Sequence, residues 1–545
     1  MMKNKRIRFS SILLVLIIFL TSFTSYAAEI EIGGKTGEIW TISSQIEPKF
    51  PDENPTDRIF AQNRRTFKGY EGRGQIIVEN HGAKSAEIYI NGKLIDIKKA
   101  LEDETEVMTI DIGKYTVNGE NLIKVLNVKP EESYIKVHIP YPSLAVGKAH
   151  EVGFSDKKLA KVDELINSEV EEGFPGAVLL IIKDGKIVKN TAYGYKLKYD
   201  GEDLLDEFVP MEVGTIFDLA SNTKMFSTNI AIQKLISEGK IKIEDKVIKY
   251  IPNFKGDGRE NIRIKDLLTH SAGFSSSIRF YMPDNPYGEE FYSDNRERTL
   301  KLLEKAPLEY ETGTKTIYSD TDYMLLGYII ENVTGKRLDE YVEKEIYEPL
   351  GLKHTMYVPL EKGLLKEQFA ATETMGNTRG GSRDYPNIRK HTLQGEVHDE
   401  KAYYSMDGVS GHAGLFSTAG DMAVLCQSLL NGGGYGNNEI FNNGVLDQFT
   451  KPSDNDITFG LGWNRAGNMD KIWQFGPYAS NLAIGHTGWT GSLTVIDPKY
   501  DMAIVLLTNK KHSNCVEDKF EGDKFETGKY GSVVSLIYEA LLENN

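Results

Sequence analysis

A serine and a lysine at the start of a predicted helix are the side chains of this sequence best placed for nucleophilic chemistry. Around them apolar residues recur at helical spacing, at Met225, Ile232, Leu235 and Ile236. Ser221 and Lys224 are three residues apart and share one helix face. A serine hydroxyl attacks only after a base removes its proton, and a desolvated lysine can be that base or can tune one. The free N–H groups of a helix start would favour negative charge developing nearby.

The same spacing occurs twice more, so the spacing alone does not single out Ser221. Ser155 stands three residues before Lys158, but it precedes an amphipathic run and is better interpreted as a helix N-cap. Ser237 stands three residues before Lys240, at the end of the predicted helix, which stops near Gly239. Both pairs are interpreted as structural.

Two further triplets follow along the chain, Tyr318-Ser319-Asp320 and His486-Thr487-Gly488. A tyrosine acts as a general base only if nearby cations depress its pKa from about 10, and Lys224 could supply that field. Glycines around the second triplet would let a substrate approach a strand edge closely. A free N–H there, paired with that of Ser221, would form an oxyanion hole, in which one donor contributes about 3–4 kcal/mol.

These motifs, in this order, resemble those of the serine β-lactamases and penicillin-binding proteins, in their class C-like branch. The segments 267–273, 395–399 and 408–421 extend the resemblance, which covers residues 152–545. It implies that Ser221 is the acylated nucleophile, Lys224 its proton partner and Tyr318 the base. It also implies an oxyanion hole made by the backbone N–H groups of Ser221 and Trp489. The substrate-binding residues it implies are Asp320, His486, Thr487 and Gly488, with no metal and no cofactor.

Two positions depart from the family pattern. Asp320 stands where members that bind penicillin usually have asparagine, and an ionised carboxylate cannot donate a hydrogen bond to a substrate carbonyl. His486 stands where many members have lysine, and a neutral histidine attracts a substrate carboxylate less strongly than a fixed cation does. Both departures leave esterase or D-aminopeptidase activity open.

The elements that must position these residues predict an α+β protein with two modules. Residues 28–150 show short alternating strands separated by Asn-Gly turns, which indicates an all-β sandwich accessory module. Residues 152–545 begin with an amphipathic helix near 156–171 and a hairpin, and end with strands and a helix. This pattern favours a sheet built from both ends of the segment with a helical region inserted, the α/β sandwich of β-lactamase type with a helical subdomain. Two long polar stretches, 275–300 and 360–406, are of a length typical of functional or disordered loops.

Residues 1–27 have the pattern of a signal peptide: four cations, an apolar run and a small-residue cleavage site. We therefore expect an extracytoplasmic protein, secreted or in the cell envelope, with an uncleaved membrane tether as the alternative. The net charge of −15 disfavours nucleic acid as a partner. Cys426 is expected in the core, and a disulfide with Cys515 stays open.

Several other polar residues are interpreted as structural. His270 and His412 are expected to be hydrogen-bonded structural histidines, and the segment His398–Glu400 a solvated loop rather than a metal site. Trp463 is expected in the core.

The sequence thus predicts a secreted, cofactor-free, monomeric serine hydrolase that forms an acyl-Ser221 intermediate. The resemblance favours a penicillin-binding D-Ala-D-Ala carboxypeptidase of cell-wall metabolism. Alternatives are a broad carboxylesterase or D-aminopeptidase, or, in a different class, a slow-turnover wall-binding or sensor protein. In that case the N-terminal module would contact glycan.

Overall fold

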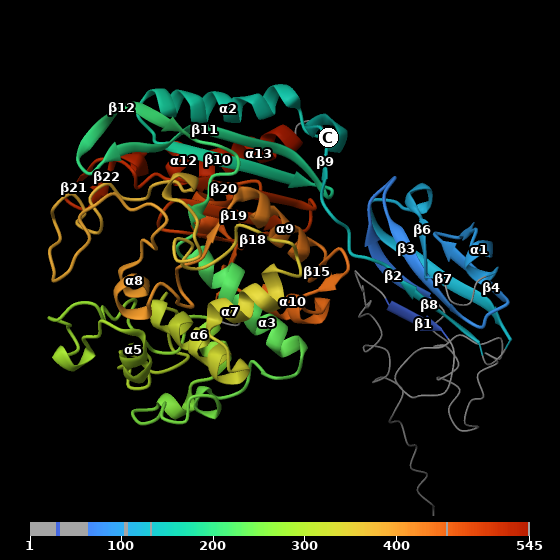
Figure 1. The fold of residues 1–545 in the computed structure, drawn as a ribbon, viewed down its shortest axis with the longest axis horizontal. Coiled ribbons are helices and arrows are strands. Elements are labelled where there is room, and N and C mark those ends of the chain that lie inside the picture. Colours follow the sequence, from blue (N-terminus) through green and yellow to red (C-terminus); the bar gives the residue numbers. More distant parts are fainter. Residues whose placement is uncertain (1–28, 33–63, 103–106, 131–132, 454–455, 543–545) are drawn as a thin grey trace, which may run out of the picture. The chain divides into compact units, whose positions relative to one another are not determined.

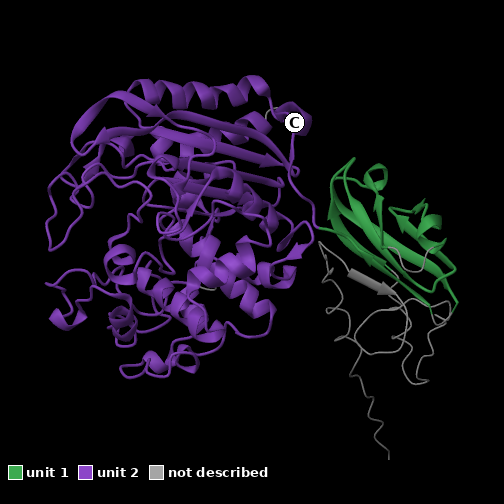
Figure 2. Ribbon diagram, in the orientation of Figure 1, with its two compact units in different colours: residues 1–140 green, residues 141–545 purple. Residues whose placement is uncertain are grey.

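The computed structural model describes residues 29–32, 64–102, 107–130, 133–453 and 456–542. The predicted signal peptide lies outside the described residues. The chain divides into two compact units, Met1–Pro140 and Tyr141–Asn545, each described here by itself (Figure 2). Within the described residues, no helix is both long enough and apolar enough to cross a membrane.

The first unit is a β-sandwich, as the alternating strand pattern predicts. One sheet has the order β1-β8-β3-β6 and the other β2-β7-β4-β5 (Figure 1). Alternate side chains such as Ile76, Val78 and Ile88 are buried between the sheets. Asn91 and Gly92 both have positive φ in the two-residue turn between β4 and β5, which is the geometry that an Asn-Gly hairpin favours. The elements are β1 (Glu29–Ile32), β2 (Arg64–Gly69), β3 (Gln75–His81), β4 (Ser85–Ile90), β5 (Lys93–Ile95), α1 (Lys98–Glu102), β6 (Val107–Asp111), β7 (Gly119–Lys129) and β8 (Tyr134–His138).

The second unit is built on one sheet to which both ends of the unit contribute, as predicted. Its strand pairs are antiparallel except β9 with β11, which is parallel. Its order is β12-β11-β10-β20-β19-β18-β17, with β9 beside β11 (Figure 1). The strands are β9 (Ala145–Val146), β10 (Gly176–Lys183), β11 (Lys186–Asp200), β12 (Asp203–Pro210), β17 (Asn464–Arg465), β18 (Ile484–Thr487), β19 (Ser492–Asp497) and β20 (Met502–Thr508). Short pairs join β13 (Phe217–Asp218) to β14 (Phe416–Ser417), β15 (Gly434–Tyr435) to β16 (Asn438–Glu439), and β21 (Cys515–Val516) to β22 (Lys519–Phe520).

Helices cover both faces of this sheet, and β10 shows why. Its side chains alternate between two buried clusters: Leu179 and Ile181 face α2 and α13, whereas Val178 and Leu180 face the inserted helical region. A central strand buried on both faces is a continuous apolar run. The helices are α2 (Asp156–Glu171), α3 (Ile230–Ser237), α4 (Ile264–Leu268), α5 (Arg296–Leu303), α6 (Asp320–Thr334), α7 (Leu338–Val342), α8 (Glu400–Met406), α9 (Ala419–Leu430), α10 (Asn443–Thr450), α11 (Ile472–Phe475), α12 (Glu526–Lys529) and α13 (Gly531–Leu542).

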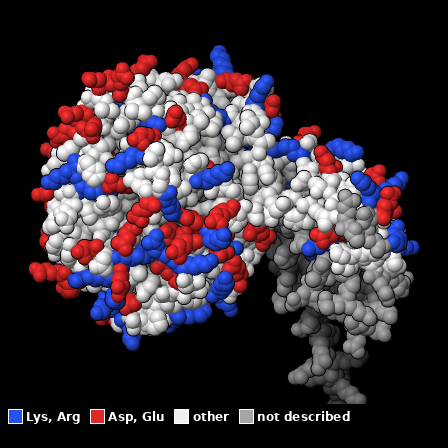
Figure 3. Space-filling model, in the orientation of Figure 1, with Lys and Arg blue, Asp and Glu red and all other residues white. Residues whose placement is uncertain are grey.

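Several local predictions can be compared directly with these elements. Ser155 is the N-cap of α2, as expected, and its hydroxyl accepts a hydrogen bond from the N–H of Lys158. Cys426 is buried in α9 and Trp463 is fully buried, as expected. Cys426 and Cys515 are both free thiols, so the structure forms no disulfide between them. Acidic and basic side chains are interspersed over the visible face of the larger unit (Figure 3).

Candidate active site

The turn that carries Ser221 is hydrogen-bonded to the start of β19, an inner strand of the central sheet, and to the loop before it. The hydroxyl of Ser492 on β19 donates to the carbonyl of Leu219 over 2.8 Å. The hydroxyl of Thr490 donates to the carbonyl of Asp218 over 2.8 Å. These bonds hold the backbone on the N-terminal side of Ser221 against the sheet.

The backbone on either side of Ser221 departs from a regular helix. Ala220 has φ +45°, a left-handed conformation that costs a residue with a side chain about 1 kcal/mol or more. Residues Lys224–Asn229 then form a π-helix, and α3 begins only at Ile230. The prediction of one regular helix up to Gly239 is therefore wrong. Because every side chain from 224 to 229 is buried, tertiary packing rather than local propensity sets the winding there.

Lys224 is fully buried and directed at Ser221. Its ammonium donates to Ser221 Oγ at 3.2 Å, to Asp320 Oδ1 at 2.8 Å and to the carbonyl of His412 at 3.2 Å. Burial lowers the pKa of Lys224, but Asp320 and Tyr318 outweigh burial and raise that pKa above its ordinary value. Lys224 is therefore protonated at neutral pH before substrate binds.

Tyr318 lies in the loop before α6, with its aromatic ring centroid 4.8 Å from the Lys224 ammonium. The residue as a whole is 39% exposed, while its hydroxyl interacts with Lys224 and Ser221. Burial of that hydroxyl raises the pKa of Tyr318. Lys224 lowers the same pKa, as the sequence predicts, but burial and Asp320 prevail and the pKa lies above its ordinary value. Tyr318 is thus also protonated at neutral pH.

Asp320, the first residue of α6, joins two lysines. One carboxylate oxygen lies 2.8 Å from Lys224 Nζ and the other 3.1 Å from Lys401 Nζ. Burial raises the pKa of Asp320, but the two lysines lower that pKa by more than burial raises it. The pKa therefore lies below its ordinary value, and the carboxylate is ionised. Lys401 also pairs with Asp399 at 3.3 Å, and Asp399 pairs with His412 Nε2 at 2.8 Å.

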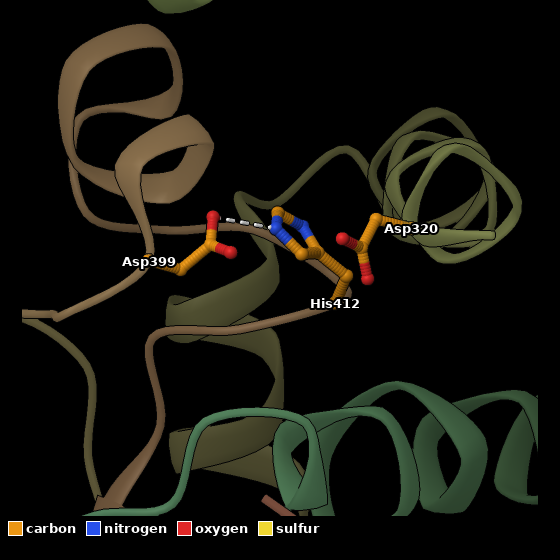
Figure 4. A group of neighbouring side chains, drawn as sticks. All are labelled: Asp320, Asp399 and His412. Carbon is orange, nitrogen blue, oxygen red and sulfur yellow. Dashed lines mark hydrogen bonds and ion pairs between the residues drawn. The ribbon is translucent and has the colours of Figure 1, made fainter. Parts of the chain in front are cut away.

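Asp320, Asp399 and His412 bring ligand-type atoms within 4.8 Å of one another (Figure 4). Both carboxylates already contact an ammonium group, at 2.8 Å for Asp320 and 3.3 Å for Asp399. A divalent cation would be held against two lysine ammonium groups, which opposes its binding. We therefore assign the cluster to an ion-pair network that holds Lys224 in place.

The end of β18 approaches the Ser221 turn closely. A Cβ added to Gly488 would lie 2.3 Å from the carbonyl oxygen of Leu219 and 3.2 Å from Ala220 Cβ, so only glycine fits there. Ser221 follows Ala220, and Trp489 follows Gly488. The backbone N–H groups of Ser221 and Trp489 donate no hydrogen bond within the part of the chain that the structure describes. Two free donors on adjacent segments have the form of an oxyanion hole.

His486 and Thr487 complete the β18 side of the site. His486 Nδ1 lies 2.8 Å from the carbonyl of Thr487, so Nδ1 carries the proton and donates it. Burial and the charge of Lys224 lower the pKa of His486 to about 3. Its Nε2 is buried and has no partner in the described residues. A neutral His486 therefore cannot supply a cation for a substrate carboxylate.

The structure corrects the interpretation of the segment 398–400. His398 is buried rather than solvated, with Nε2 2.8 Å from Glu373 and its N–H donating to Asp218 over 2.6 Å. His270 is structural, as predicted: its Nδ1 lies 2.8 Å from Asp322 Oδ2.

Lys401 and its contact with Asp320 were not predicted from the sequence. The only signal was the alternation of charge at the start of α8, in the run Asp399-Glu400-Lys401. His412 is hydrogen-bonded, as predicted, but it belongs to the network around Lys224 rather than to a remote structural contact.

Comparison with known proteins identifies the family. A family model described as Beta-lactamase matches residues 161–523. The chain belongs to the beta-lactamase family. It is 55% identical over 399 residues to the N-acetylmuramyl-L-alanine amidase of Bacillus subtilis (strain 168), covering 71% of this chain and 90% of that protein. It is 49% identical over 412 residues to an Escherichia coli (strain K12) protein named "Putative D-alanyl-D-alanine carboxypeptidase". That alignment covers 74% of this chain and 94% of the relative.

Solved structures of the beta-lactamase fold also match. EstCE1, a hydrolase with promiscuous acyltransferase activity, aligns with a TM-score of 0.52 at 23% identity, covering 69% of this chain and 99% of that one. A penicillin-binding protein homologue from Caulobacter crescentus aligns with a TM-score of 0.52 at 20% identity, covering 71% of this chain and 99% of that one. These alignments confirm the predicted α+β fold. The family match and the 49% identical relative make this beta-lactamase family member a serine hydrolase.

The protonated state of Lys224 and Tyr318 predicts a distinctive pH profile. Because both pKa values are raised, the form that can accept the Ser221 proton is a minority at neutral pH, so kcat/KM should rise with pH by up to about tenfold per unit. Asp320→Asn removes the anion that stabilises protonated Lys224 and should move this rise about 1–3 units lower.

The matched control is Asp399→Asn, which keeps a side chain able to cap α8 and alters a carboxylate that does not contact Lys224. Because Asp399 reaches Lys224 only through Lys401 and His412, the kcat/KM profile measured from pH 5.5 to 10 should shift less for this control than for Asp320→Asn. If Asp320→Asn shifts the rise no more than the control does, Asp320 does not set the pKa of the base.

Proposed function

We propose that this protein hydrolyses amide bonds of cell-wall peptides through an acyl-Ser221 intermediate. The observation that carries the proposal is the contact between Lys224 Nζ and Ser221 Oγ at 3.2 Å, beside two free backbone N–H donors. Ser221 Oγ forms a bond to the carbonyl carbon, and its proton passes to the deprotonated form of Lys224 or Tyr318. The N–H groups of Ser221 and Trp489 stabilise the oxyanion.

The intermediate then collapses and the C–N bond breaks. The leaving amine takes up the proton that Ser221 gave, through Tyr318 or Lys224. Water next attacks the acyl ester, releases a carboxylic acid and returns the proton to Ser221 Oγ. Each step needs only the groups of this site and water.

The bond between the muramyl lactyl group and L-alanine is the first candidate for cleavage. The relative that is 55% identical is named for that activity. Neutral His486 also supports it, because this reaction needs no cation at that position to bind a terminal carboxylate. Cleavage of D-Ala-D-Ala, with binding of penicillins, is the second candidate, and the relative named as a carboxypeptidase at 49% identity favours it.

Two substrates distinguish these candidates. N-acetylmuramyl peptide and a pentapeptide ending in D-Ala-D-Ala are incubated separately with the protein and with Ser221→Ala, and products are separated by mass. Release of N-acetylmuramic acid that depends on Ser221 supports the first candidate, and release of D-alanine supports the second. Turnover of a short-chain ester alone would move the assignment to a carboxylesterase.

We also propose that the protein works outside the cytoplasm. Support comes from the leader-like pattern of residues 1–27 and from a substrate that belongs to the wall. N-terminal sequencing of the protein recovered from cells is expected to begin near residue 28. An intact N-terminus together with a cytosolic location would contradict this.

A further inference from the structure

A cavity of about 290 Å³ lies beside the candidate active site, close to the smallest volumes usual for ligand sites. Cationic side chains outnumber anionic ones on its wall. The cations are Arg279, Arg379, Arg383 and Lys401, and the anions are Glu400 and Asp518. We propose that this cavity binds a carboxylate of the substrate next to the bond that is cleaved. The inference rests on the proposed amide hydrolase function and specifies its substrate.

Two residues connect the cavity to the reacting groups. Trp489 lines the cavity with its side chain, and its backbone N–H is one of the two free donors beside Ser221. Lys401 also lines the cavity and contacts Asp320 at 3.1 Å, which in turn contacts Lys224 at 2.8 Å. A group bound in the cavity would therefore lie next to the substrate carbonyl.

Two of the four cations already have buried partners. Arg379 pairs with Glu373 and, at 2.7 Å, with Glu400. Lys401 pairs with Asp320 and Asp399. These pairs satisfy the anion Glu400, and because two cations face four carboxylates, this inner part of the wall has no unpaired positive charge to offer a ligand.

The other two cations are available to a ligand. The side chain of Arg279 is exposed and makes no ion pair within the described residues; its one hydrogen bond is to Met282 Sδ at 3.9 Å. Arg383 pairs with Asp518 at 3.1 Å, but the two side chains are 36% and 48% exposed. The pair is bidentate, with Nε 3.2 Å and Nη2 3.1 Å from Asp518, so a ligand carboxylate would bind Arg383 through Nη1 or by displacing this exposed partner. Guanidinium groups bind carboxylates through two parallel hydrogen bonds.

The cavity also supplies the positive charge that the β18 side of the site lacks. His486, at the position where many family members have lysine, is neutral, with a pKa of about 3. Arg279 and Arg383 instead place fixed charge in the cavity that Trp489 also lines. Cell-wall peptides carry carboxylates both on a glutamyl residue and at the C-terminus, and either could occupy the cavity.

The test compares substrates that differ in one carboxylate. N-acetylmuramyl-L-Ala-D-Glu is compared with its form amidated on glutamate, and the D-Ala-D-Ala pentapeptide with its C-terminal amide. The variants are Arg279→Ala, Arg383→Ala and, as an exposed arginine outside the cavity, Arg298→Ala. The wild-type protein should prefer one free carboxylate by about tenfold or more in kcat/KM. Arg279→Ala and Arg383→Ala should raise KM about tenfold for that substrate, with kcat and the amidated form changed less than twofold.

The substrate pair that shows this loss of preference identifies which carboxylate is bound. Equal effects of the arginine variants on free and amidated substrates, or no preference in the wild-type protein, would overturn the inference while leaving the proposed function standing. The absence of any cleavage that depends on Ser221 would overturn the proposed function and this inference with it.

Discussion

Replacing Ser221 by alanine is expected to lower kcat/KM by about 10⁴–10⁶-fold, because the variant has no atom to form the acyl intermediate. The fold should be retained. Lys224 keeps hydrogen bonds to Asp320 at 2.8 Å and to the carbonyl of His412 at 3.2 Å when the serine hydroxyl is gone. Hydrolysis of the cell-wall substrate and of an activated ester should fall together.

The two other Ser-x-x-Lys matches provide controls of identical chemistry. Ser237→Ala alters a hydroxyl that only accepts hydrogen bonds from Asn442, and activity should be unchanged. Ser155→Ala removes the N-cap of α2 and should lower the free energy of unfolding by about 1 kcal/mol without loss of activity. Residual activity of Ser221→Ala above about 1% of wild type would show that another nucleophile carries the reaction.

Replacing Lys224 by methionine is expected to lower kcat/KM by about 10²–10⁴-fold, the range attributed to a positioned proton-transfer group. Methionine fills similar buried space without a charge. Removing one partner of a buried ion pair normally costs several kcal/mol, but Asp320 retains Lys401 at 3.1 Å. The free energy of unfolding should therefore fall much less than activity does.

Lys234→Met on α3 is the matched control, since the side chain of Lys234 is 15% exposed and its ammonium pairs with Glu238. Its activity should stay within twofold of wild type. If Lys224→Met lost less than tenfold in kcat/KM, the proton of Ser221 would have to leave by a route that does not need Lys224.

The sequence predicted the elements in which local pattern and tertiary packing agree. The helix α2 has the bounds Asp156–Glu171 that its N-cap and apolar spacing indicate. The second strand of the predicted hairpin was expected only over residues 186–188, whereas β11 extends to Asp200. Its later residues include lysines and asparagine, and most of them are only partly buried, so the apolar alternation used to recognise a strand is lost.

The sequence singled out the three motifs of the candidate site, but it did not predict the ion pairs around Lys224 or the resulting shifts of pKa. The approach of Lys401 to Asp320 could not be predicted, because Lys401 lies in the polar stretch 360–406 and its position depends on partners far along the chain. The same stretch supplies Arg379 and Arg383, and the polar stretch 275–300 supplies Arg279. Both stretches lack the periodicity that identifies an element, although the structure places them around the site.

The most direct test of the account is to locate the acyl group. The protein is mixed with a penicillin and, separately, with an activated short-chain ester, and its intact mass and peptide map are measured. The account predicts an adduct with at least one of these reagents, confined to the peptide that contains Ser221 and absent from Ser221→Ala. An adduct that maps elsewhere, or one that persists in Ser221→Ala, would contradict it.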